Sequence, residues 1–274
     1  MAPTLSLIVT TYEWPAALAV VLDAVRRQRI APLEVVVADD GSGPATRETI
    51  VQAARDFPVP LRPVWGPDEG FRLNTSRNRG IAAARGDYLV LLDGDMVPHP
   101  AFVADHLAAA RPGCYVQGGR VLLGPRATAR ALAAGRLAAG WWTRDLRNRA
   151  NAVRLPALST WYRGPQGAVR RTRGAHLAFW RADALRVNGF EEAFTTWGRD
   201  DNEFVARLLH AGVARRNLKW AAVAFHLHHR AGGAVSAENE ARLARTLAER
   251  RVRAERGLDA LLPRVAEFER VGLA

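Results

Sequence analysis

The stretch YLVLLDGDMVPHP, residues 88–100, is apolar from Tyr88 to Leu92 and then carries Asp93 and Asp95 on either side of a glycine. An apolar run of this length bounded by turn residues is typical of a strand buried on both faces, the kind found inside a parallel sheet. Ligands of open α/β sheets bind where such strands end. Because Asp-Gly is also ordinary turn chemistry, this stretch alone is equally consistent with a turn and with a binding site.

Strand and helix patterns alternate before this stretch. We expect strands over residues 5–11, 33–39 and 61–65, and helices over 16–28, from about Pro44, and over 74–85. Such alternation predicts an α/β fold with a mostly parallel, Rossmann-like sheet flanked by helices. The second half is less regular, with an expected helix over 127–150, a loop over 156–174, a strand over 176–180, a helix over 200–211 and a strand over 218–229.

The chain from Ser236 onward is expected to be a helical extension. Its apolar residues recur at spacings of three, four and seven, which is typical of a packed helix or helix pair: Leu247, Ala254, Leu258, Leu261, Val265 and Phe268. We interpret this extension as a helix that covers the domain or mediates dimerisation. An arginine-rich helix at a membrane surface is the alternative.

Composition bounds the class of protein. With 274 residues and 49% hydrophobic content, the chain can bury a substantial core. Its single cysteine, Cys114, excludes an intrachain disulfide and a cysteine-rich zinc module. The amino terminus is more like a first strand than a signal peptide, and no apolar run approaches the roughly 20 residues of a membrane span. We therefore expect a cytoplasmic protein.

The net charge of +12 favours anionic ligands, such as nucleotide diphosphates, anionic glycans, acidic lipid headgroups or nucleic acid, and does not choose among them. Aromatic residues are not interleaved with arginines as a nucleic-acid stacking platform would require, so we expect no nucleic-acid partner. Peripheral association with the inner face of the membrane stays open, as does the oligomeric state.

A second expected strand also ends in carboxylates. VVVADDGSG, residues 35–43, has an acidic pair where a phosphate-binding loop would carry glycines. A carboxylate at this point can accept hydrogen bonds from a base or ribose. Strand ends with Thr10 and Thr11, Asp39 and Asp40, and Asp93 and Asp95 favour one binding site jointly, more than any of them does singly.

At this point the chain resembles family 2 glycosyltransferases with the GT-A fold. The segments that carry the resemblance are LSLIVTTYEWP (5–15), VVVADDGSG, NTSRNRG (74–80) and LLDGDM (91–96). GFEEAFTTWGRDDNEF (189–204) is similar to the acceptor half of galactosyl- and N-acetylgalactosaminyl-transferases and of bacterial chondroitin-type polymerases. The resemblance implies a nucleotide-binding half over 1–97, an acceptor-binding half over 98–230 and the helical extension over 231–274.

The resemblance also implies roles at the donor site. It assigns Thr10, Tyr12 and Asp40 to the nucleotide and Asp93 to the ribose and the water shell of a cation. Asp95 becomes a direct ligand of Mn²⁺ or Mg²⁺, which would neutralise the diphosphate leaving group. Arg77 or Arg79 is expected to pair with the diphosphate, with a solvated helix charge as the alternative.

On the acceptor side, the resemblance makes Asp201 the general base that deprotonates the acceptor hydroxyl. Asp200 would bind acceptor hydroxyls, and Trp197 would offer a sugar ring an apolar face. The plainer alternative is that the two aspartates cap a helix and interact with its dipole. Both interpretations can hold at once.

The sequence HLHH, residues 226–229, follows an expected strand and is a candidate for further metal ligands. The resemblance favours His226, with His228 and His229 as competitors. The strand period of two places His226 and His228 on one face, so we predict these two as ligands. Zinc is less attractive because no cysteine joins the cluster and the aspartates suit harder cations.

We therefore expect a metal-dependent, inverting hexosyltransferase that moves a sugar from a UDP-sugar to a hydroxyl of a glycan or glycoconjugate. Direct attack assisted by one general base would invert the anomeric carbon. The rival interpretations are a nucleotidyltransferase and a non-catalytic glycan- or nucleic-acid-binding protein.

Overall fold

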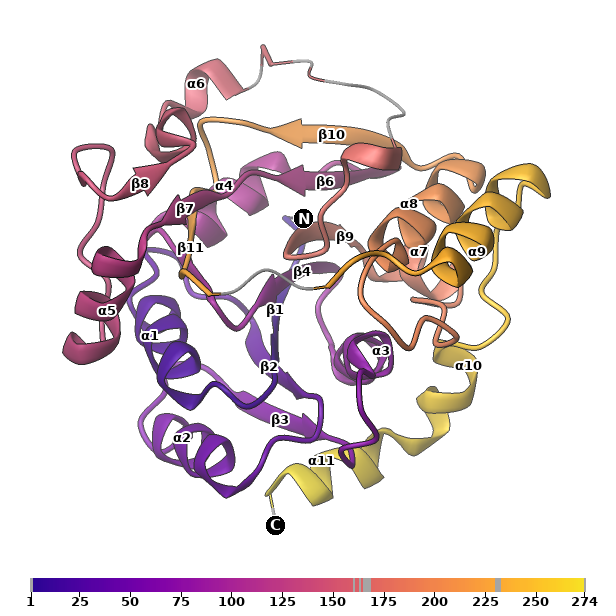
Figure 1. Cartoon of the computed structure of the whole chain (residues 1–274), viewed down its shortest axis with the longest axis horizontal. Helices are drawn as coiled ribbons and strands as arrows, with labels where there is room; N and C mark the ends of the chain where they lie inside the picture. The colour runs from indigo at the N-terminus through magenta and orange to yellow at the C-terminus, as the bar shows by residue number, and fades with distance from the viewer. Residues whose placement is uncertain (1, 160, 163, 165–168, 230–232, 274) are drawn as a thin grey trace.

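The computed structural model describes residues 2–159, 161, 162, 164, 169–229 and 233–273. Its centre is a seven-stranded sheet in the order β10-β6-β9-β4-β1-β2-β3 (Figure 1). The strands are β1 (Leu5–Thr11), β2 (Glu34–Asp39), β3 (Leu61–Trp65), β4 (Tyr88–Asp93), β6 (Cys114–Gly118), β9 (His176–Trp180) and β10 (Ala214–Leu218). Only β9 runs antiparallel to its neighbours, so the predicted α/β fold with a mostly parallel sheet is confirmed.

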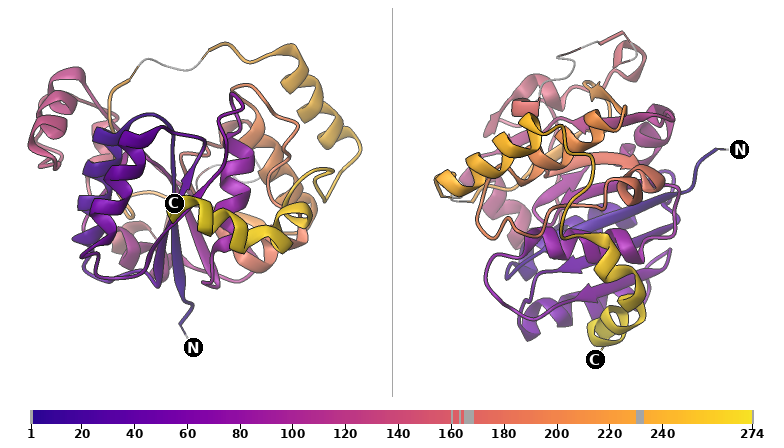
Figure 2. Two further views of the ribbon diagram at one scale, coloured as in Figure 1. Left: turned by 90° about the horizontal axis from the view of Figure 1, so that it is seen from below. Right: turned by 90° about the vertical axis from the view of Figure 1, so that its right-hand side faces the viewer.

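The strand register brings the expected site residues to one edge of the sheet. Thr10 of β1 lies opposite Asp93 of β4, and Thr11 lies opposite Asp39 of β2. Successive residues of a strand point to opposite faces. Leu7 accordingly packs with α1 (Pro15–Arg26), whereas Ile8 packs with α3 (Leu73–Ala83) on the other face (Figure 2).

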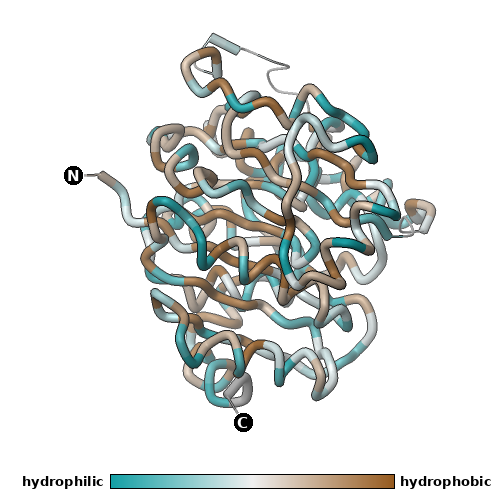
Figure 3. Tube along the Cα trace, turned by 90° about the vertical axis from the view of Figure 1, so that its left-hand side faces the viewer, coloured by the Kyte–Doolittle hydropathy of each residue, from teal (hydrophilic) through white to brown (hydrophobic). Residues whose placement is uncertain are grey.

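The other helices complete both layers. They are α2 (Pro44–Ala54), α4 (Phe102–Ala109), α7 (Arg181–Arg186) and α8 (Asp200–His210). Figure 3 shows long hydrophobic stretches in the interior of the molecule, whereas hydrophilic and hydrophobic segments alternate around it. No helix in the described part of the chain is both long enough and apolar enough to cross a bilayer.

A small second sheet, in the order β5-β11-β7-β8, lies beside the end of β4. Its strands are β5 (Met96–Pro98), β7 (Val121–Leu123), β8 (Leu146–Arg147) and β11 (Ala224–His226). The pairing of His226 with Met96 brings the histidine segment next to Asp95.

Two sequence predictions in this half were wrong. The helix expected over 127–150 is α5 (Pro125–Ala134), which ends because Gly135 adopts a left-handed conformation with φ of 63°. Two short helical turns follow, at Arg149–Ala152 and Pro156–Ser159, which is α6. The strand expected over 218–229 is broken between β10 and β11, where Trp220 and Ala222 have positive φ.

The C-terminal extension consists of α9 (Ala237–Ala248), α10 (Leu258–Leu261), a turn at Leu262–Arg264 and α11 (Val265–Leu273). Leu258, Leu261 and Phe268 are buried in the core beside α3, as expected for a covering helix, whereas Leu247 is exposed. The alternative of an arginine-rich membrane helix does not fit this inward apolar face. The boundaries at 97/98 and 230/231 stay predictions.

Candidate active site

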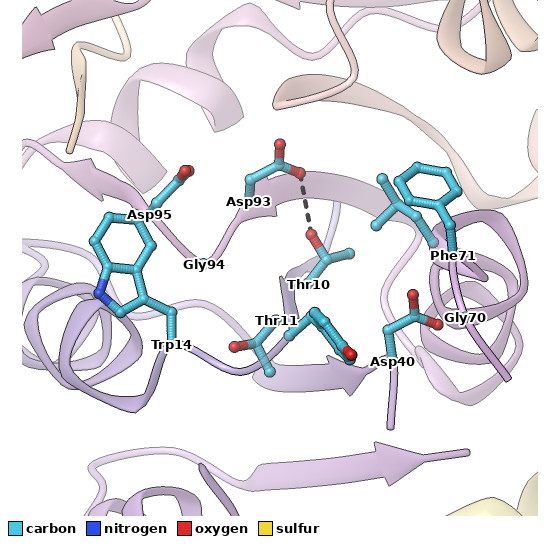
Figure 4. Close-up of a pocket in the computed structure, with 11 residues that line it drawn as sticks. Thr10, Thr11, Trp14, Asp40, Gly70, Phe71, Asp93, Gly94 and Asp95 are labelled. Atoms are coloured by element: carbon cyan, nitrogen blue, oxygen red, sulfur yellow. Dashed lines mark hydrogen bonds between the residues drawn. The ribbon is translucent and has the colours of Figure 1, made fainter. Parts of the chain in front are cut away.

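A pocket opens at the carboxyl ends of β1, β2 and β4 (Figure 4). Its lining combines the expected polar residues with three that sequence reasoning missed, Trp14, Phe71 and Leu73. Such a mostly apolar lining with a few polar groups is typical of a small-molecule site. The missed residues lie in loops or at helix starts, where no periodic pattern signals them.

The two aspartates after β2 have different roles. Oδ1 of Asp39 accepts hydrogen bonds from the N–H groups of Gly41 and Ser42 at 3.2 and 2.8 Å, so this carboxylate holds the turn. Asp40 lines the pocket; its Oδ2 accepts from the N–H of Arg72 at 3.1 Å. Its Oδ1 is buried and has no partner among the described residues, and burial raises the pKa of Asp40 to about 6. Asp40 therefore offers an acceptor to a ligand.

Tyr12 also lines this pocket, although its side chain is largely exposed and donates a hydrogen bond to Asp68 at 3.2 Å. On the other side, Thr10 donates to Oδ1 of Asp93 at 3.0 Å, as Figure 4 shows. Gly94 follows, and a Cβ built there would lie 2.6 Å from the carbonyl oxygen of Thr10. The turn between the two aspartates thus needs glycine because β1 and β4 approach closely here.

Asp95, His226 and His229 form a cluster whose candidate ligand atoms all lie within 4.8 Å of one another. Oδ2 of Asp95 is 3.5 Å from Nε2 of His226 and 3.1 Å from Nε2 of His229. Oδ1 of Asp95 is buried without a partner among the described residues, which leaves an acceptor for a cation. One carboxylate and two imidazoles are a donor set that transition-metal dications accept.

The structure places His228 apart from the cluster of Asp95, His226 and His229. Strand β11 ends at His226, so the alternation of side chains does not extend to residue 228. His228 is exposed outside the cluster, and its backbone N–H donates to Thr128 at 2.8 Å. The chain turns after the strand and brings back His229, whose ring packs edge-on against Trp14 with 5.9 Å between centroids.

The two arginines of α3, which were expected to pair with a diphosphate, both contact other protein groups in the structure. Arg77 is buried, with Nη1 2.7 Å from Asp200 and Nη2 3.5 Å from Asp93. Arg79 packs its guanidinium 5.4 Å from the ring of Phe268, outside the lining of the pocket. Arg77 is therefore held by two carboxylates, whereas Arg79 contacts an aromatic ring and its buried Nε has no partner among the described residues.

Asp200 and Asp201 begin α8, with Arg199 in a left-handed conformation before them. The two oxygens of Asp201 accept hydrogen bonds from the N–H groups of Gly174 and Asn202, each at 2.7 Å. Burial and the neighbouring charge of Asp200 nevertheless raise the pKa of Asp201 to about 7, against the opposing effect of Arg77. A carboxyl group with this pKa is suited to proton transfer near neutral pH.

The peptide before β9 connects Asp201 to the strand-end aspartates. Gly174 donates to Asp201, and the carbonyl oxygen of the next residue, Ala175, accepts from the N–H of Asp93 at 3.2 Å. Trp197 is half exposed before α8, and its carbonyl oxygen accepts from Asn239 of α9. The peptide at residues 174 and 175 thus joins Asp93 to the start of α8. The contacts of Trp197 do not test the predicted role of its ring, which is to cover a face of a sugar.

Sequence reasoning missed a cationic element of the site. The buried amide of Gln117 accepts from the N–H of Arg173 at 3.0 Å and donates to its carbonyl oxygen at 3.2 Å. This clamp fixes the backbone of Arg173. Burial and the positive charge of Arg173 lower the pKa of Arg120, whereas the charges of Asp93, Asp95 and Asp201 act in the opposite direction. Nε of Arg120 is buried without a partner among the described residues. No local sequence pattern reveals that the charges of Asp93, Asp95 and Asp201 act on Arg120, which lies between β6 and β7.

Comparison with known proteins gives the site its context. The family "Glycosyl transferase family 2" matches residues 6–172, more than half of the chain, and "N-terminal domain of galactosyltransferase" matches residues 158–230. The chain is 29% identical to chondroitin synthase of Escherichia coli over 81% of its length and 34% of the relative. It is 31% identical to validoxylamine A glucosyltransferase of Streptomyces hygroscopicus subsp. limoneus over 77% of its length and 49% of the relative. The chain thus spans a third to a half of these curated relatives.

Solved structures share the fold. A mannosyltransferase from Pyrobaculum calidifontis in complex with GDP-Man and Mn²⁺ gives a TM-score of 0.59 at 19% identity, covering 100% of this chain and 72% of that one. S. aureus TarS 1–349 in complex with UDP-GlcNAc gives 0.62 at 17% identity, covering 97% of this chain and 71% of that one. The sheet and its flanking helices are a GT-A fold, and the chain belongs to glycosyl transferase family 2.

Proposed function

We propose that the chain transfers a sugar from a UDP-sugar to a hydroxyl group of a glycan or glycoconjugate, with inversion at the anomeric carbon. The observation that carries the proposal is the meeting, at one edge of the sheet, of the pocket with Asp40 and the cluster of Asp95, His226 and His229. A nucleotide base and a diphosphate-bound cation need these two kinds of site side by side.

Asp40 supports a uracil base. Its Oδ2 already accepts from Arg72, which leaves Oδ1 as the buried oxygen without a partner among the described residues. One free acceptor matches the single ring N–H of uracil, whereas guanine presents two adjacent donors. The apolar faces of Phe71 and Leu73 line the same pocket and suit the plane of a base.

The types of ligand atom in the cluster indicate which cation would bind. Mg²⁺ prefers oxygen ligands, and the cluster offers two imidazole nitrogens beside one carboxylate, so we infer Mn²⁺ rather than Mg²⁺ as the preferred ion. Asp95, His226 and His229 would hold it. When bound, such a cation neutralises the charge that develops on a diphosphate leaving group.

Residues at and near the start of α8 would carry out proton transfer and acceptor binding. Asp201 would take the proton of the acceptor hydroxyl on a carboxylate oxygen, and no enzyme nucleophile is needed for an inverting reaction. The backbone N–H groups of Gly174 and Asn202 fix the orientation of that carboxylate. Asp200, bound to Arg77, would fix the start of α8 and leave one oxygen for an acceptor hydroxyl. The exposed ring of Trp197 would cover a face of the acceptor sugar.

A ligand screen tests the proposal. Because a ligand that binds only the folded state stabilises it, UDP or a UDP-sugar with Mn²⁺ should raise the melting temperature by several degrees at saturating concentrations. GDP should raise it less. Asp40→Ala should abolish the UDP effect, whereas Asp87→Ala, at the opposite end of β4, should retain it. If no uridine nucleotide stabilised the protein, the assignment of the pocket would be wrong.

The products distinguish the rival enzyme. A glycosyltransferase releases nucleoside diphosphate, whereas a nucleotidyltransferase would release pyrophosphate or consume it. A chain that bound nucleotide sugars without consuming them, with every hydroxyl acceptor offered, would instead be a non-catalytic binding protein.

A further inference from the structure

Residues 125–162, here called the Arg/Trp segment, are unlike the rest of the surface. The segment contains seven arginines and one acidic residue, Asp145, hence a net charge of +6, half of the +12 of the whole chain. It includes α5, β8 and α6, which lie at the edge of the molecule outside the seven-stranded sheet (Figures 1 and 2). The proposed transfer reaction assigns no role to any residue of the segment.

The segment exposes large aromatic side chains. The three most exposed large apolar residues in the described part of the chain all lie here: Trp161 at 82%, Trp142 at 67% and Trp141 at 58%. Leu155 and Leu158 are exposed as well. Single exposed apolar residues are ordinary, but such a concentration marks an interaction surface.

The positive charge of the segment is presented outward. Of its arginines, only Arg154 pairs with a carboxylate of the described residues, Asp105, at 2.6 Å. Asp145 faces inward, where its Oδ2 accepts from the N–H of Ala127 at the start of α5. Arg149 donates to the carbonyl oxygen of Trp141 at 2.6 Å and so fixes the loop that carries the two tryptophans. The field of the exposed arginines is therefore not offset within the segment.

A hollow beside α5 combines both properties. It is lined by alanines together with Leu137 and Trp142, and also by Arg130, Arg136 and Arg144. These three arginines are exposed. A hollow lined by apolar side chains and exposed arginines matches an amphiphile that joins an anionic headgroup to a hydrocarbon chain.

We propose that the Arg/Trp segment docks the protein on an anionic phospholipid surface. The arginines would lie at the headgroups, and Trp141 and Trp142 would enter the interface, where indole rings are favoured. A soluble acidic glycan fits less well. The two indole rings meet nearly at right angles, 83°, with 6.1 Å between centroids, so they present no common flat face for sugar rings.

Vesicle binding by the full chain tests this proposal. We expect co-sedimentation with vesicles of phosphatidylcholine mixed with phosphatidylglycerol, and none with phosphatidylcholine alone. Arg136→Gln/Arg144→Gln should weaken binding about 25-fold, at about fivefold for each arginine near the surface. Trp141→Ala/Trp142→Ala should weaken it about tenfold or more and remove most of the fluorescence quenching by brominated lipid. Ile30→Ala/Leu33→Ala, which removes exposed apolar residues elsewhere, is the matched control and should bind like the wild type.

The outcomes separate lipid from other polyanions. Melting temperatures and UDP stabilisation of each variant report its folding, so a misfolded variant is recognised. No binding of the wild type to the mixed vesicles would overturn the proposal. It would also be overturned if dextran sulfate competed fully and the arginine variant lost binding while the tryptophan variant did not. That result would identify a surface for soluble acidic polymers.

Discussion

Asp201→Asn is the most informative change because Asp201 carries the proposed proton transfer. Burial and the charge of Asp200 raise the pKa of Asp201 to about 7, so about half of the molecules hold an ionised base at neutral pH. At about pH 5 only about one in a hundred does. Wild-type turnover should therefore rise about tenfold per pH unit up to about pH 7 and then level off.

The asparagine variant should lose about 10² to 10⁴ in turnover, the usual contribution of a positioned base, together with this acidic limb. UDP affinity should stay near that of the wild type because Asp201 lies outside the lining of the nucleotide pocket. The assay is release of UDP from the donor identified by the ligand screen, measured across the pH range. Retained turnover, or an acidic limb that persists in the variant, would show that another group is the base.

Stability gives a second measurement that needs no substrate. Between the unfolded pKa of 3.8 and about 7, the folded chain keeps a proton on Asp201 that the unfolded chain has lost, so stability falls as pH rises. The full shift corresponds to at most about 4 kcal/mol. The Asp201→Asn variant cannot lose stability in this way. The difference between its melting temperature and that of the wild type should therefore increase from acidic to neutral pH. A constant difference would mean that the pKa is not raised.

Asp200→Asn is the matched control. Removing the charge of Asp200 should shift the acidic limb of turnover to lower pH without abolishing it, because that charge helps to raise the pKa of Asp201. If Asp200→Asn instead removed the limb and Asp201→Asn kept it, the assignments of the two residues would be reversed.

Three further changes test the other charged groups. His229→Ala should weaken Mn²⁺ binding by at least about tenfold, measured by calorimetry, whereas His228→Ala should leave it unchanged; the reverse result would restore the sequence prediction. Arg77→Gln should lower the free energy of unfolding by about 3–5 kcal/mol, measured by urea denaturation, because it leaves two carboxylates without their buried partner. A loss below about 1 kcal/mol would contradict the ion pairs described here. Arg120→Gln should weaken UDP binding about tenfold but leave uridine binding unchanged, the loss expected for one charge-assisted hydrogen bond to phosphate. Equal losses for both ligands would place Arg120 at the base.

The strand ends were predictable from sequence because their signal is local. A short apolar run followed by aspartate and glycine defines both the strand and its end, as for β2 and β4. The helix expected over 127–150 failed because alanine and leucine composition suggested helix, while a left-handed Gly135 ended it. Local composition thus predicted the type of an element better than its length.

Some site residues were likewise predictable from local sequence patterns, and others were not. Asp40 and Asp95 lie where their strands end, so their place followed from the strands. The choice between His228 and His229 depended on where β11 ends, and the alternation rule holds only within a strand. Arg120 was not predicted, because the carboxylates whose charges act on its pKa, Asp93, Asp95 and Asp201, come from other parts of the chain. Interactions of this kind follow from the tertiary fold and have no sequence period.

The contacts of Arg77 limit which positive groups can neutralise a diphosphate. Its guanidinium is enclosed between Asp93 of β4 and Asp200 of α8, and it lies 5.1 Å from the ring centre of Phe190. A buried arginine cannot leave two carboxylates to follow a phosphate group without leaving both charges unpaired. Its role is therefore to join the nucleotide-side carboxylate to the start of α8, which sets the position of Asp201 one residue later. We infer that a diphosphate would then be neutralised by groups that hold no such ion pairs, a cation bound by Asp95 and the guanidinium of Arg120.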